Sequence, residues 1–295
     1  MKEKRLEIFI TFKCNNDCLF CVEKTNKDKY KGKQIFRDKQ HIEEELNKYR
    51  KQGYTYLNLL GGEPFLAKDF STILQTSKSL GFVVALATNA SVLSSEKIAE
   101  QYLPYIDELI VSIHGHNKLL INQISQNPNL YDKLIKGLNN IKKYFKGRLL
   151  KANCVINNLN HKYLLDILKF INKFNIKEVN LTYMDIDKYC QNYVVKMEDL
   201  RPLIKPLVDY SEQQNMVLRF SELPYCVLGD YYYLANDLYF QNRDKYFVDG
   251  KKDKVYFWKK YKGKVCQDCN VTDICKGLNK DYYKLYGDKE LIAFQ

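Results

Sequence analysis

Three cysteines near the start of the chain stand close enough together to share one metal centre. Cys14, Cys18 and Cys21 are separated by three and two residues, and they follow an apolar run, Leu6 to Phe12. Thiolates are soft, anionic ligands that select iron–sulfur clusters or zinc. A four-iron cluster held by three cysteines keeps one iron open for a non-protein ligand. Structural zinc takes four ligands, and no fourth Cys or His lies near the three, since the next histidine is His41.

A second motif, Gly61-Gly62-Glu63-Pro64, follows the next strand-like run. Two glycines allow a backbone to come close to a ligand, because no Cβ stands in the way. Glu63 carries a negative charge that suits an ammonium group, and Pro64 stiffens the exit from the turn. The turn is therefore a candidate ligand-binding site that follows the second strand-like run.

The bulk composition predicts a cytoplasmic protein with a sizeable core. The chain has 295 residues, of which 45% are hydrophobic, enough for one large domain or one domain with an appendage. It contains no run of 18 apolar residues, so we expect no membrane span. The charged N-terminus leads into a run too short for a signal peptide. Nine cysteines without an export signal indicate a reducing compartment, where thiols bind metals.

The chain is basic, with 47 Lys and Arg against 35 Asp and Glu and a formal charge of +12. Such a surface can attract RNA, a phosphorylated substrate or an acidic peptide. However, the lysines are scattered, and the sequence has no Arg-rich helix or RNP-type motif. We therefore do not expect a nucleic acid as partner.

Strand-like and helical runs alternate from residue 6 to about 184. Strands are expected at Leu6–Phe12, Thr55–Leu60, Phe82–Thr88, Glu108–His114, Leu149–Asn157 and Glu178–Met184. Helices are expected at about 38–52, 68–80, 94–103, 131–145 and 160–174, with Gly53 and Gly81 at two of their C-terminal caps. This alternation predicts a parallel sheet of α/β class. Six units are too few for a closed eight-unit barrel.

Polar residues gather where these strands end. In a βα barrel the chemistry lies at the carboxyl ends of the strands. The cysteines follow the first strand and Gly-Gly-Glu-Pro ends the second, while Thr88-Asn89 ends the third and Ser112 to His114 end the fourth. On strand five, alternation turns Cys154 towards the helices as a buried thiol and Asn153 towards the lumen, as a contact to cofactor or substrate or as the cap of a local turn.

The pattern changes after residue 185, so we predict a division into residues 1–190 and 191–295. A helix is expected at Glu198–Gln214, a strand at Met216–Phe220 and a hairpin within 245–258 around Asp249-Gly250. The region also holds four cysteines, Cys226, Cys266, Cys269 and Cys275. Four thiolates suit either a four-iron cluster or tetrahedral zinc.

The cysteine spacing and Gly61-Gly62-Glu63-Pro64 resemble the motifs of the radical S-adenosylmethionine (SAM) superfamily. The resemblance implies an open six-unit βα (partial TIM) barrel, in which Cys14, Cys18 and Cys21 ligate a [4Fe-4S] cluster whose open iron chelates SAM. It also implies reductive cleavage of SAM to methionine and a 5′-deoxyadenosyl radical, which abstracts hydrogen from a substrate.

The same resemblance implies contacts to SAM. Phe20 matches the aromatic position near the adenine, and residues 61–64 match the contact to the methionine end. Thr88 and Asn89 resemble the polar pair of the third strand, and Ser112 resembles the ribose or carboxylate contact. The chain departs from the family pattern at Ala90, which replaces a glycine, at His114, which replaces an acid, and at Ser125-Gln126, which replaces Thr-Gly.

The four C-terminal cysteines resemble the auxiliary-cluster extension called the twitch domain, a short form of the SPASM domain. The Cys266-to-Cys275 spacing is shared with SPASM proteins, but only enough cysteines remain for one auxiliary [4Fe-4S] cluster. A zinc knuckle formed by Cys226, Cys266, Cys269 and Cys275 is the competing interpretation.

Relatives with this extension imply a substrate class. Many modify ribosomally made peptides by oxidation, cross-linking or epimerisation, and we expect a precursor peptide as substrate. The chain begins too close to its cysteines for a fused recognition domain, so a separate peptide-recognition protein or direct docking is expected. An electron donor such as flavodoxin or ferredoxin is the other expected partner. Cys190, beyond strand six, is hypothesised to be exposed to the active site as a catalytic hydrogen-atom donor.

Two alternatives stay open. A radical SAM enzyme of this kind can act on a small molecule or an RNA instead of a peptide. A cytoplasmic metal-binding redox sensor is the non-enzyme alternative, although a sensor has no need of the Gly61–Pro64 site for the SAM amine.

Overall fold

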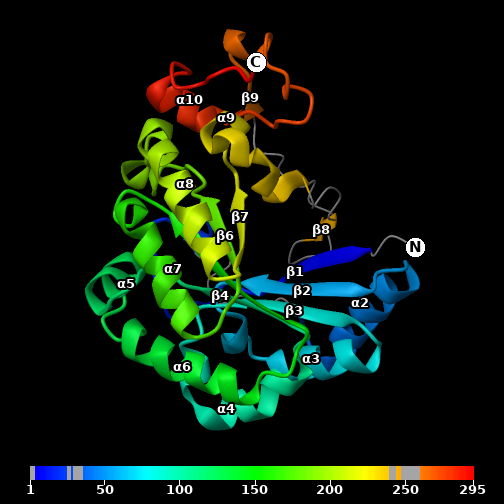
Figure 1. Cartoon of the computed structure of the whole chain (residues 1–295). Coiled ribbons are helices and arrows are strands. Elements are labelled where there is room, and N and C mark those ends of the chain that lie inside the picture. Colours follow the sequence, from blue (N-terminus) through cyan, green and yellow to red (C-terminus); the bar gives the residue numbers. More distant parts are fainter. Residues whose placement is uncertain (1–3, 25–27, 29–35, 239–243, 247–259) are drawn as a thin grey trace. The chain divides into compact units, whose positions relative to one another are not determined.

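The computed structural model describes residues 4–24, 28, 36–238, 244–246 and 260–295. Strands and helices alternate along the chain, and β1, β2 and β3 lie side by side in Figure 1. The main strands are β1 (Arg5–Thr11), β2 (Tyr56–Gly61), β3 (Val83–Thr88), β4 (Glu108–Ser112), β5 (Leu149–Ile156), β6 (Glu178–Tyr183), β7 (Val217–Ser221) and β8 (Asp244–Tyr246). The helices are α2 (Lys39–Lys51), α3 (Phe70–Ser79), α4 (Glu96–Tyr102), α5 (Lys118–Ser125), α6 (Leu130–Tyr144), α7 (Leu164–Lys173), α8 (Met197–Gln213), α9 (Tyr225–Leu228) and α10 (Lys280–Tyr286).

The sheet has the order β7-β6-β5-β4-β3-β2-β1-β8. All six predicted strands are confirmed to within one or two residues, and the α/β class is confirmed with them. The predicted strand near Met216–Phe220 also forms, as β7, and it extends the sheet by pairing in parallel with β6. Strand β8 pairs in parallel with β1 at the other edge. The predicted hairpin within 245–258 lies largely outside the described residues.

Alternation along each strand gives the sheet its two faces. In β1, Leu6, Ile8 and Ile10 are buried, while on the other face Phe9 and Thr11 are half-buried and Glu7 is buried. The same period of two recurs in β5, β6 and β7, as expected for side chains that alternate across a pleated strand. Polar side chains on the second face are therefore available for chemistry, since the apolar set already fills the core.

The predicted helices are confirmed, and the glycine caps with them. Gly53 and Gly81 have φ of +87° and +73°, a left-handed conformation that glycine adopts without strain. Helix α5 was not predicted; its first turn is capped by Asn117, whose side chain accepts a hydrogen bond from the Leu120 amide at 2.9 Å.

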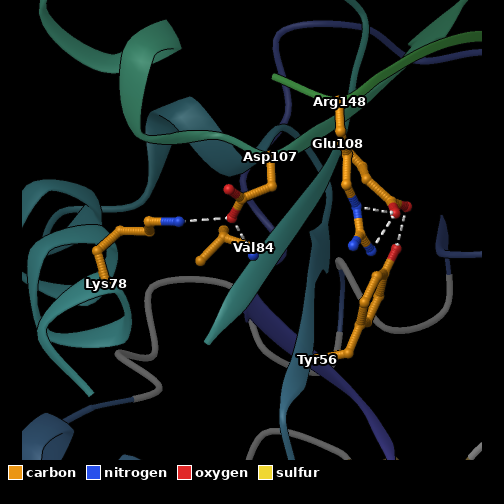
Figure 2. Close-up of polar contacts among 6 residues, drawn as sticks. All are labelled: Tyr56, Lys78, Val84, Asp107, Glu108 and Arg148. Carbon is orange, nitrogen blue, oxygen red and sulfur yellow. Dashed lines mark hydrogen bonds and ion pairs between the residues drawn. The ribbon is translucent and has the colours of Figure 1, made fainter. Parts of the chain in front are cut away.

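A charged cluster closes the amino ends of β3 and β4 (Figure 2). Glu108, only 6% exposed, accepts hydrogen bonds from the Tyr56 hydroxyl at 2.5 Å and from two guanidinium nitrogens of Arg148 at 2.6 and 2.9 Å. The preceding Asp107 accepts from the Lys78 ammonium at 2.6 Å and from the Val84 amide at 2.7 Å. Both carboxylates thus have their charge paired by a cation and an additional donor, which the buried Glu108 in particular requires.

The described residues fall into two compact units. One lies within 1–112, 117–152 and 242–255, and it contains β1 to β4; the other lies within 113–116, 153–241 and 256–295, and it contains β6, β7 and the short antiparallel pair β9 (Lys260–Tyr261) and β10 (Leu278–Asn279). The division into residues 1–190 and 191–295 stays a prediction. None of the helices in the described ranges has both the length and the apolar character needed to cross a bilayer.

Candidate functional site

The loop that carries the three cysteines is bonded directly to the Gly61–Glu63 turn. The Gly62 amide donates to the Thr11 carbonyl at 2.8 Å, and the Glu63 amide donates to the Lys13 carbonyl at 2.9 Å. A Cβ on Gly61, whose φ is +149°, would lie 2.0 Å from the Thr11 carbonyl oxygen; one on Gly62 would lie 2.5 Å from the Lys13 carbonyl oxygen. The two glycines are therefore required for the close packing of two backbone segments, a reason that the sequence did not reveal.

Glu63 links this turn to the end of β3. It is fully buried, and its carboxylate accepts from the Thr88 hydroxyl at 2.8 Å and from the Asn89 amide at 2.8 Å. Burial raises the pKa of Glu63 to about 7, although the hydrogen bonds from Asn89, Thr88 and Phe65 act in the opposite direction. The predicted polar residues at 63, 88 and 89 are thus brought together, with Glu63 acting as a brace between two strand ends.

Asn89 continues this connection to the cysteine loop. Its side-chain amide donates to Asn15 Oδ1 at 2.9 Å and lies 4.0 Å from the Cys14 sulfur. Asn15 in turn donates to the Ser91 hydroxyl at 2.6 Å, and the Ser91 hydroxyl donates to Asn89 Oδ1 at 2.5 Å. A closed ring of amide and hydroxyl groups therefore holds the first part of the cysteine loop against the end of β3.

The end of α5 holds the second part of the loop. The amides of Asp17 and Leu19 donate to the carbonyls of Ser125 and Ile124, both at 3.0 Å. The Asn127 side chain donates to Asn16 Oδ1 at 2.8 Å and to the Asn15 carbonyl at 3.1 Å. Ser125, noted in the sequence as a departure from the family pattern, thus contributes through its backbone.

The thiols themselves fit a negatively charged metal cluster. Cys14, Cys18 and Cys21 are all half-buried and free of disulfides. The Asn16 amide lies 3.5 Å from the Cys14 sulfur, and N–H groups beside a sulfur stabilise thiolate ligands. In the same unit, Phe20 and Ser112 are half-buried and Pro64 is buried. Their predicted contacts to SAM stay predictions.

His114 and Asn153 lie together in the second unit. His114 Nδ1 accepts from the Val155 amide at 3.1 Å, and the His114 carbonyl accepts from the Asn160 side chain at 3.0 Å. Burial lowers the pKa of His114 to about 3, which agrees with a neutral ring whose Nδ1 is an acceptor. Asn153 Oδ1 accepts from the Asn180 side-chain amide at 3.0 Å and from the Thr182 hydroxyl at 2.7 Å. The predicted role of each residue towards SAM stays untested.

The four C-terminal cysteines line one cavity, although Cys226 and Cys266 are far apart in the sequence. Cys226, Cys266, Cys269 and Cys275 share this cavity with Leu291 and Ile292 from the C-terminal segment. Backbone amides reach the sulfurs: Gly277 lies 3.3 Å from Cys275, and Phe294 lies 3.4 Å from Cys269.

The sulfurs of Cys226 and Cys266 also have backbone hydrogen-bond partners. Burial raises the pKa of Cys226 and that of Cys266, while hydrogen bonds from the Ile292 and Gly263 backbones oppose these shifts. All four sulfurs thus have a backbone partner, which fits thiolate ligands. Within the described ranges, no three His, Cys, Asp or Glu side chains are gathered as a site for a single metal ion.

The remaining two cysteines are buried. Cys154 is inaccessible to solvent, as predicted, and burial raises its pKa to about 12. The expectation that Cys190 is exposed was wrong: it is also inaccessible, because its thiol turns inward to the Asp185 carbonyl at 3.0 Å and accepts from the Asp187 amide at 3.3 Å. Burial raises the pKa of Cys190 to about 12 as well.

Several polar residues of these sites were not predicted from the sequence. Asn15, Ser91 and Asn127 were overlooked because each acts through a long-range contact that no local pattern encodes. Asn180 and Thr182 were detectable, since they alternate with the apolar residues of β6 in the same way as Asn153 does on β5.

Known proteins resemble the chain in sequence and in fold. It is 28% identical over 194 residues to a GTP 3′,8-cyclase of Aquifex aeolicus, which covers 62% of this chain and 57% of the relative. The chain thus spans little more than half the length of that relative.

Two solved structures share the fold at low sequence identity. Native anSMEcpe with bound AdoMet and Cp18Cys peptide has a TM-score of 0.70 and 18% identity, covering 99% of this chain and 93% of that one. Streptococcus suis SuiB bound to precursor peptide SuiA has a TM-score of 0.65 and 16% identity, covering 99% and 75%. These likenesses identify the fold as an α/β partial barrel.

The family model of the radical SAM superfamily matches residues 8–171, more than half of the chain, and includes both the cysteine loop and the Gly61–Pro64 turn. The chain belongs to the radical SAM superfamily.

Proposed function

We propose that this protein cleaves SAM reductively at a [4Fe-4S] cluster ligated by Cys14, Cys18 and Cys21. The observation that carries the proposal is the direct bonding of the cysteine loop to the Gly61–Glu63 turn, through the Gly62 and Glu63 amides. This bonding holds the start of the cysteine loop against the turn that the family uses for the methionine end of SAM, which supports the assignment. When bound, the cluster and SAM supply one-electron cleavage of the sulfonium C–S bond.

The residues of this chain supply position and charge. Glu63 is engaged by Thr88 and Asn89, so we assign it the bracing of the turn, and we leave contact with the SAM ammonium to the backbone groups beside it. The Asn89–Asn15–Ser91 ring holds Cys14 at the end of β3. Phe20 and Ser112 remain the proposed contacts to adenine and to ribose or carboxylate.

Release of 5′-deoxyadenosine tests the proposal. Protein reconstituted anaerobically with iron and sulfide, then given dithionite and SAM, should release it. Replacing Cys14, Cys18 and Cys21 together with Ala should abolish the release. Cys154→Ala is the matched control, because it also removes a thiol but at a buried position on β5, and it should retain the release. Cleavage of SAM by the triple variant would refute the assignment.

We further propose that Cys226, Cys266, Cys269 and Cys275 ligate a second [4Fe-4S] cluster. Their common cavity and the amide–sulfur contacts support this ligand set. Four thiolates leave no open iron, which favours electron transfer over direct binding of substrate.

Metal analysis distinguishes this cluster from a zinc knuckle. The wild type should contain about eight irons per chain, and the Cys14/Cys18/Cys21 variant about four. About one zinc, together with only about four irons in the wild type, would identify the knuckle instead.

For the substrate we propose a ribosomally made peptide, presented directly or by a separate recognition protein, with flavodoxin or ferredoxin as electron donor. The fold likeness along nearly the whole chain to two peptide-bound structures supports this class. The Aquifex relative, named GTP 3′,8-cyclase, supports a nucleotide as the second candidate. Mass spectrometry of a reaction with GTP separates them: consumption of GTP that depends on SAM would favour the nucleotide.

A further inference from the structure

A row of neutral polar side chains crosses the inner face of β5, β6 and β7. The row, here called the amide strip, consists of Asn153, Asn180, Thr182, Ser221 and Asn236. All five side chains are half-buried, so each keeps part of its surface accessible. Ser221 lies in register with Thr182, and a parallel bridge between Phe220 and Ala235 brings Asn236 beside β7.

Hydrogen bonds inside the strip run in one direction. The Asn236 amide donates to the Ser221 hydroxyl at 3.1 Å, and Ser221 donates to Asn180 Oδ1 at 2.9 Å. Asn180 Nδ2 donates to Asn153 Oδ1 at 3.0 Å and to the Thr182 hydroxyl at 2.8 Å, and Thr182 donates to Asn153 Oδ1 at 2.7 Å. These contacts tie the orientations of the side-chain amides to one another, because reversing any one of them alone would place a donor against a donor.

The two ends of the strip keep hydrogen-bonding capacity. Asn153 uses its oxygen twice, and the part of the chain that the structure describes provides no acceptor for its Nδ2 group. Asn236 uses its nitrogen, and the described residues provide no donor for its Oδ1. One end therefore offers a donor and the other an acceptor, the two groups that complement the C=O and N–H of an amide.

Two cations near the strip, Lys260 and Arg219, are already engaged. The Lys260 ammonium is paired with the carboxylate of Glu222, the residue after Ser221, at 2.7 Å. Arg219 lies on the same face as Ser221, but one level nearer the amino ends and in register with Asn180, and it is engaged in an interaction of its own. Binding of several phosphate charges requires unpaired cations or clustered N–H donors, whereas a neutral amide requires only the strip itself.

We infer that the amide strip is a binding site for the main-chain amides of a peptide, and that it selects such a substrate over a nucleoside triphosphate. The inference rests on the proposed function and deepens it, because it assigns the substrate class to named residues. Asn153 Nδ2 donates to a peptide carbonyl, Asn236 Oδ1 accepts from a peptide N–H, and Asn180 holds both ends in register.

Ligand-observed NMR under anaerobic conditions tests this with two probes at equal concentration, N-acetyl-trialanine amide and GTP with magnesium. The full-length wild type should bind the capped tripeptide more tightly than GTP. Asn153→Ala and Asn236→Ala should each weaken tripeptide binding about fivefold, the value of one hydrogen bond. Asn236 lies outside the strands, so its variant tests the strip even if Asn153→Ala folds poorly. Asn172→Ala on α7, which contacts Gln214 instead, is the matched control and should bind as the wild type does.

Three results would overturn the inference: tighter binding of GTP, no binding of the tripeptide, or unchanged tripeptide affinity in both strip variants. Failure of the proposed function is separate, because it is read from 5′-deoxyadenosine release by the wild type. If the wild type releases 5′-deoxyadenosine but does not bind the tripeptide, only the binding role of the amide strip is refuted. If it binds the tripeptide but releases no 5′-deoxyadenosine, only the proposed cleavage of SAM is refuted.

Discussion

The two ends of strands β1 to β4 are built from different chemistry. At the amino ends, Asp107 and Glu108 are neutralised by Lys78 and Arg148 in short, direct ion pairs (Figure 2). At the carboxyl ends, the contacts are made by backbone amides, asparagines and hydroxyls around the buried carboxylate of Glu63.

The difference separates stability from function. The charged cluster at the amino ends is complete within itself, since each carboxylate has a cation and a further donor. The carboxyl ends position half-buried thiols and leave them available to a ligand, as βα folds generally do. Substitutions at the two ends should therefore affect different measurements.

The largest effect is expected from Gly61→Ala. The new Cβ would lie 2.0 Å from the Thr11 carbonyl, so the turn and the cysteine loop must separate. We expect about a hundredfold loss of 5′-deoxyadenosine release, the usual cost of displacing reacting groups by about 1 Å. Gly53→Ala has a similar left-handed strain, but its Cβ meets no atom within 4 Å; it should cost about 1 kcal/mol of stability and leave the release intact. Equal activities of the two variants would contradict the packing argument.

Glu63, at the carboxyl ends, should make the free energy of unfolding depend on pH. Its pKa is raised from 4.5 to about 7, so the folded protein binds a proton that the unfolded chain releases between these values. The free energy of unfolding should therefore fall as pH rises from about 4.5 to 7, by up to about 3 kcal/mol. Urea titrations of metal-free protein at several pH values measure the slope, and Glu63→Gln should flatten it. If the wild type instead gained stability over this range relative to Glu63→Gln, the direction of the Glu63 pKa shift would be wrong.

Arg148→Ala should act on stability alone. It leaves the buried Glu108 carboxylate with the Tyr56 hydroxyl but without its cation. Because Arg148 is itself half exposed, we expect a loss of about 2 kcal/mol, less than for a fully buried pair. Lys118→Ala, which removes an exposed ion pair with Asp132, should cost less than about 0.5 kcal/mol. Chemical denaturation measures both, and a loss of 5′-deoxyadenosine release per folded Arg148→Ala molecule would blur the distinction between the two ends.

The smallest effect is expected from Asn127→Ala, which removes two hydrogen bonds to the cysteine loop. We expect about 1 kcal/mol of destabilisation and faster loss of iron to a chelator. Asn140→Ala provides the comparison, because it removes one side-chain bond to the Leu93 carbonyl, away from the loop. The Asn140→Ala variant should lose a similar amount of stability without losing iron faster. Identical iron retention in the two variants would argue that the Asn127 hydrogen bonds do not hold the cysteine loop.

Much of the fold followed from local patterns. The strands and most helices were predictable because apolar periods and glycine caps such as Gly53 are properties of short segments. Helix α5 was missed because its last residue, Ser125, and the following Gln126 were interpreted as part of a loop. The pairing of β7 with β6 and of β8 with β1 was also missed, because pairing between strands is decided by contacts far apart in the sequence.

The site was predictable in its residue types but not in their roles. Cys14, Cys18 and Cys21 were identifiable from spacing alone, whereas the closeness of Gly61 to Thr11 depends on how two loops pack. Glu63 was expected to face a ligand, and only its burial revealed a brace between strand ends. Cys190 was expected to be exposed to the active site because it follows a strand end, but the local turn at Asp187 folds its thiol inward.

The amides of Ile292 and Phe294 at the sulfurs of Cys226 and Cys269 have a consequence for biosynthesis. Translation proceeds from the N-terminus, and Gly62, Asn89, Ser125 and Asn127, which are hydrogen-bonded to the cysteine loop and the residues just before it, are synthesised in the first half of the chain. The C-terminal cavity instead joins Cys226 to a segment that leaves the ribosome much later. The nascent chain therefore acquires the partners of its first set of thiols well before those of its second, and a supplier of iron and sulfide meets the two sets in that order.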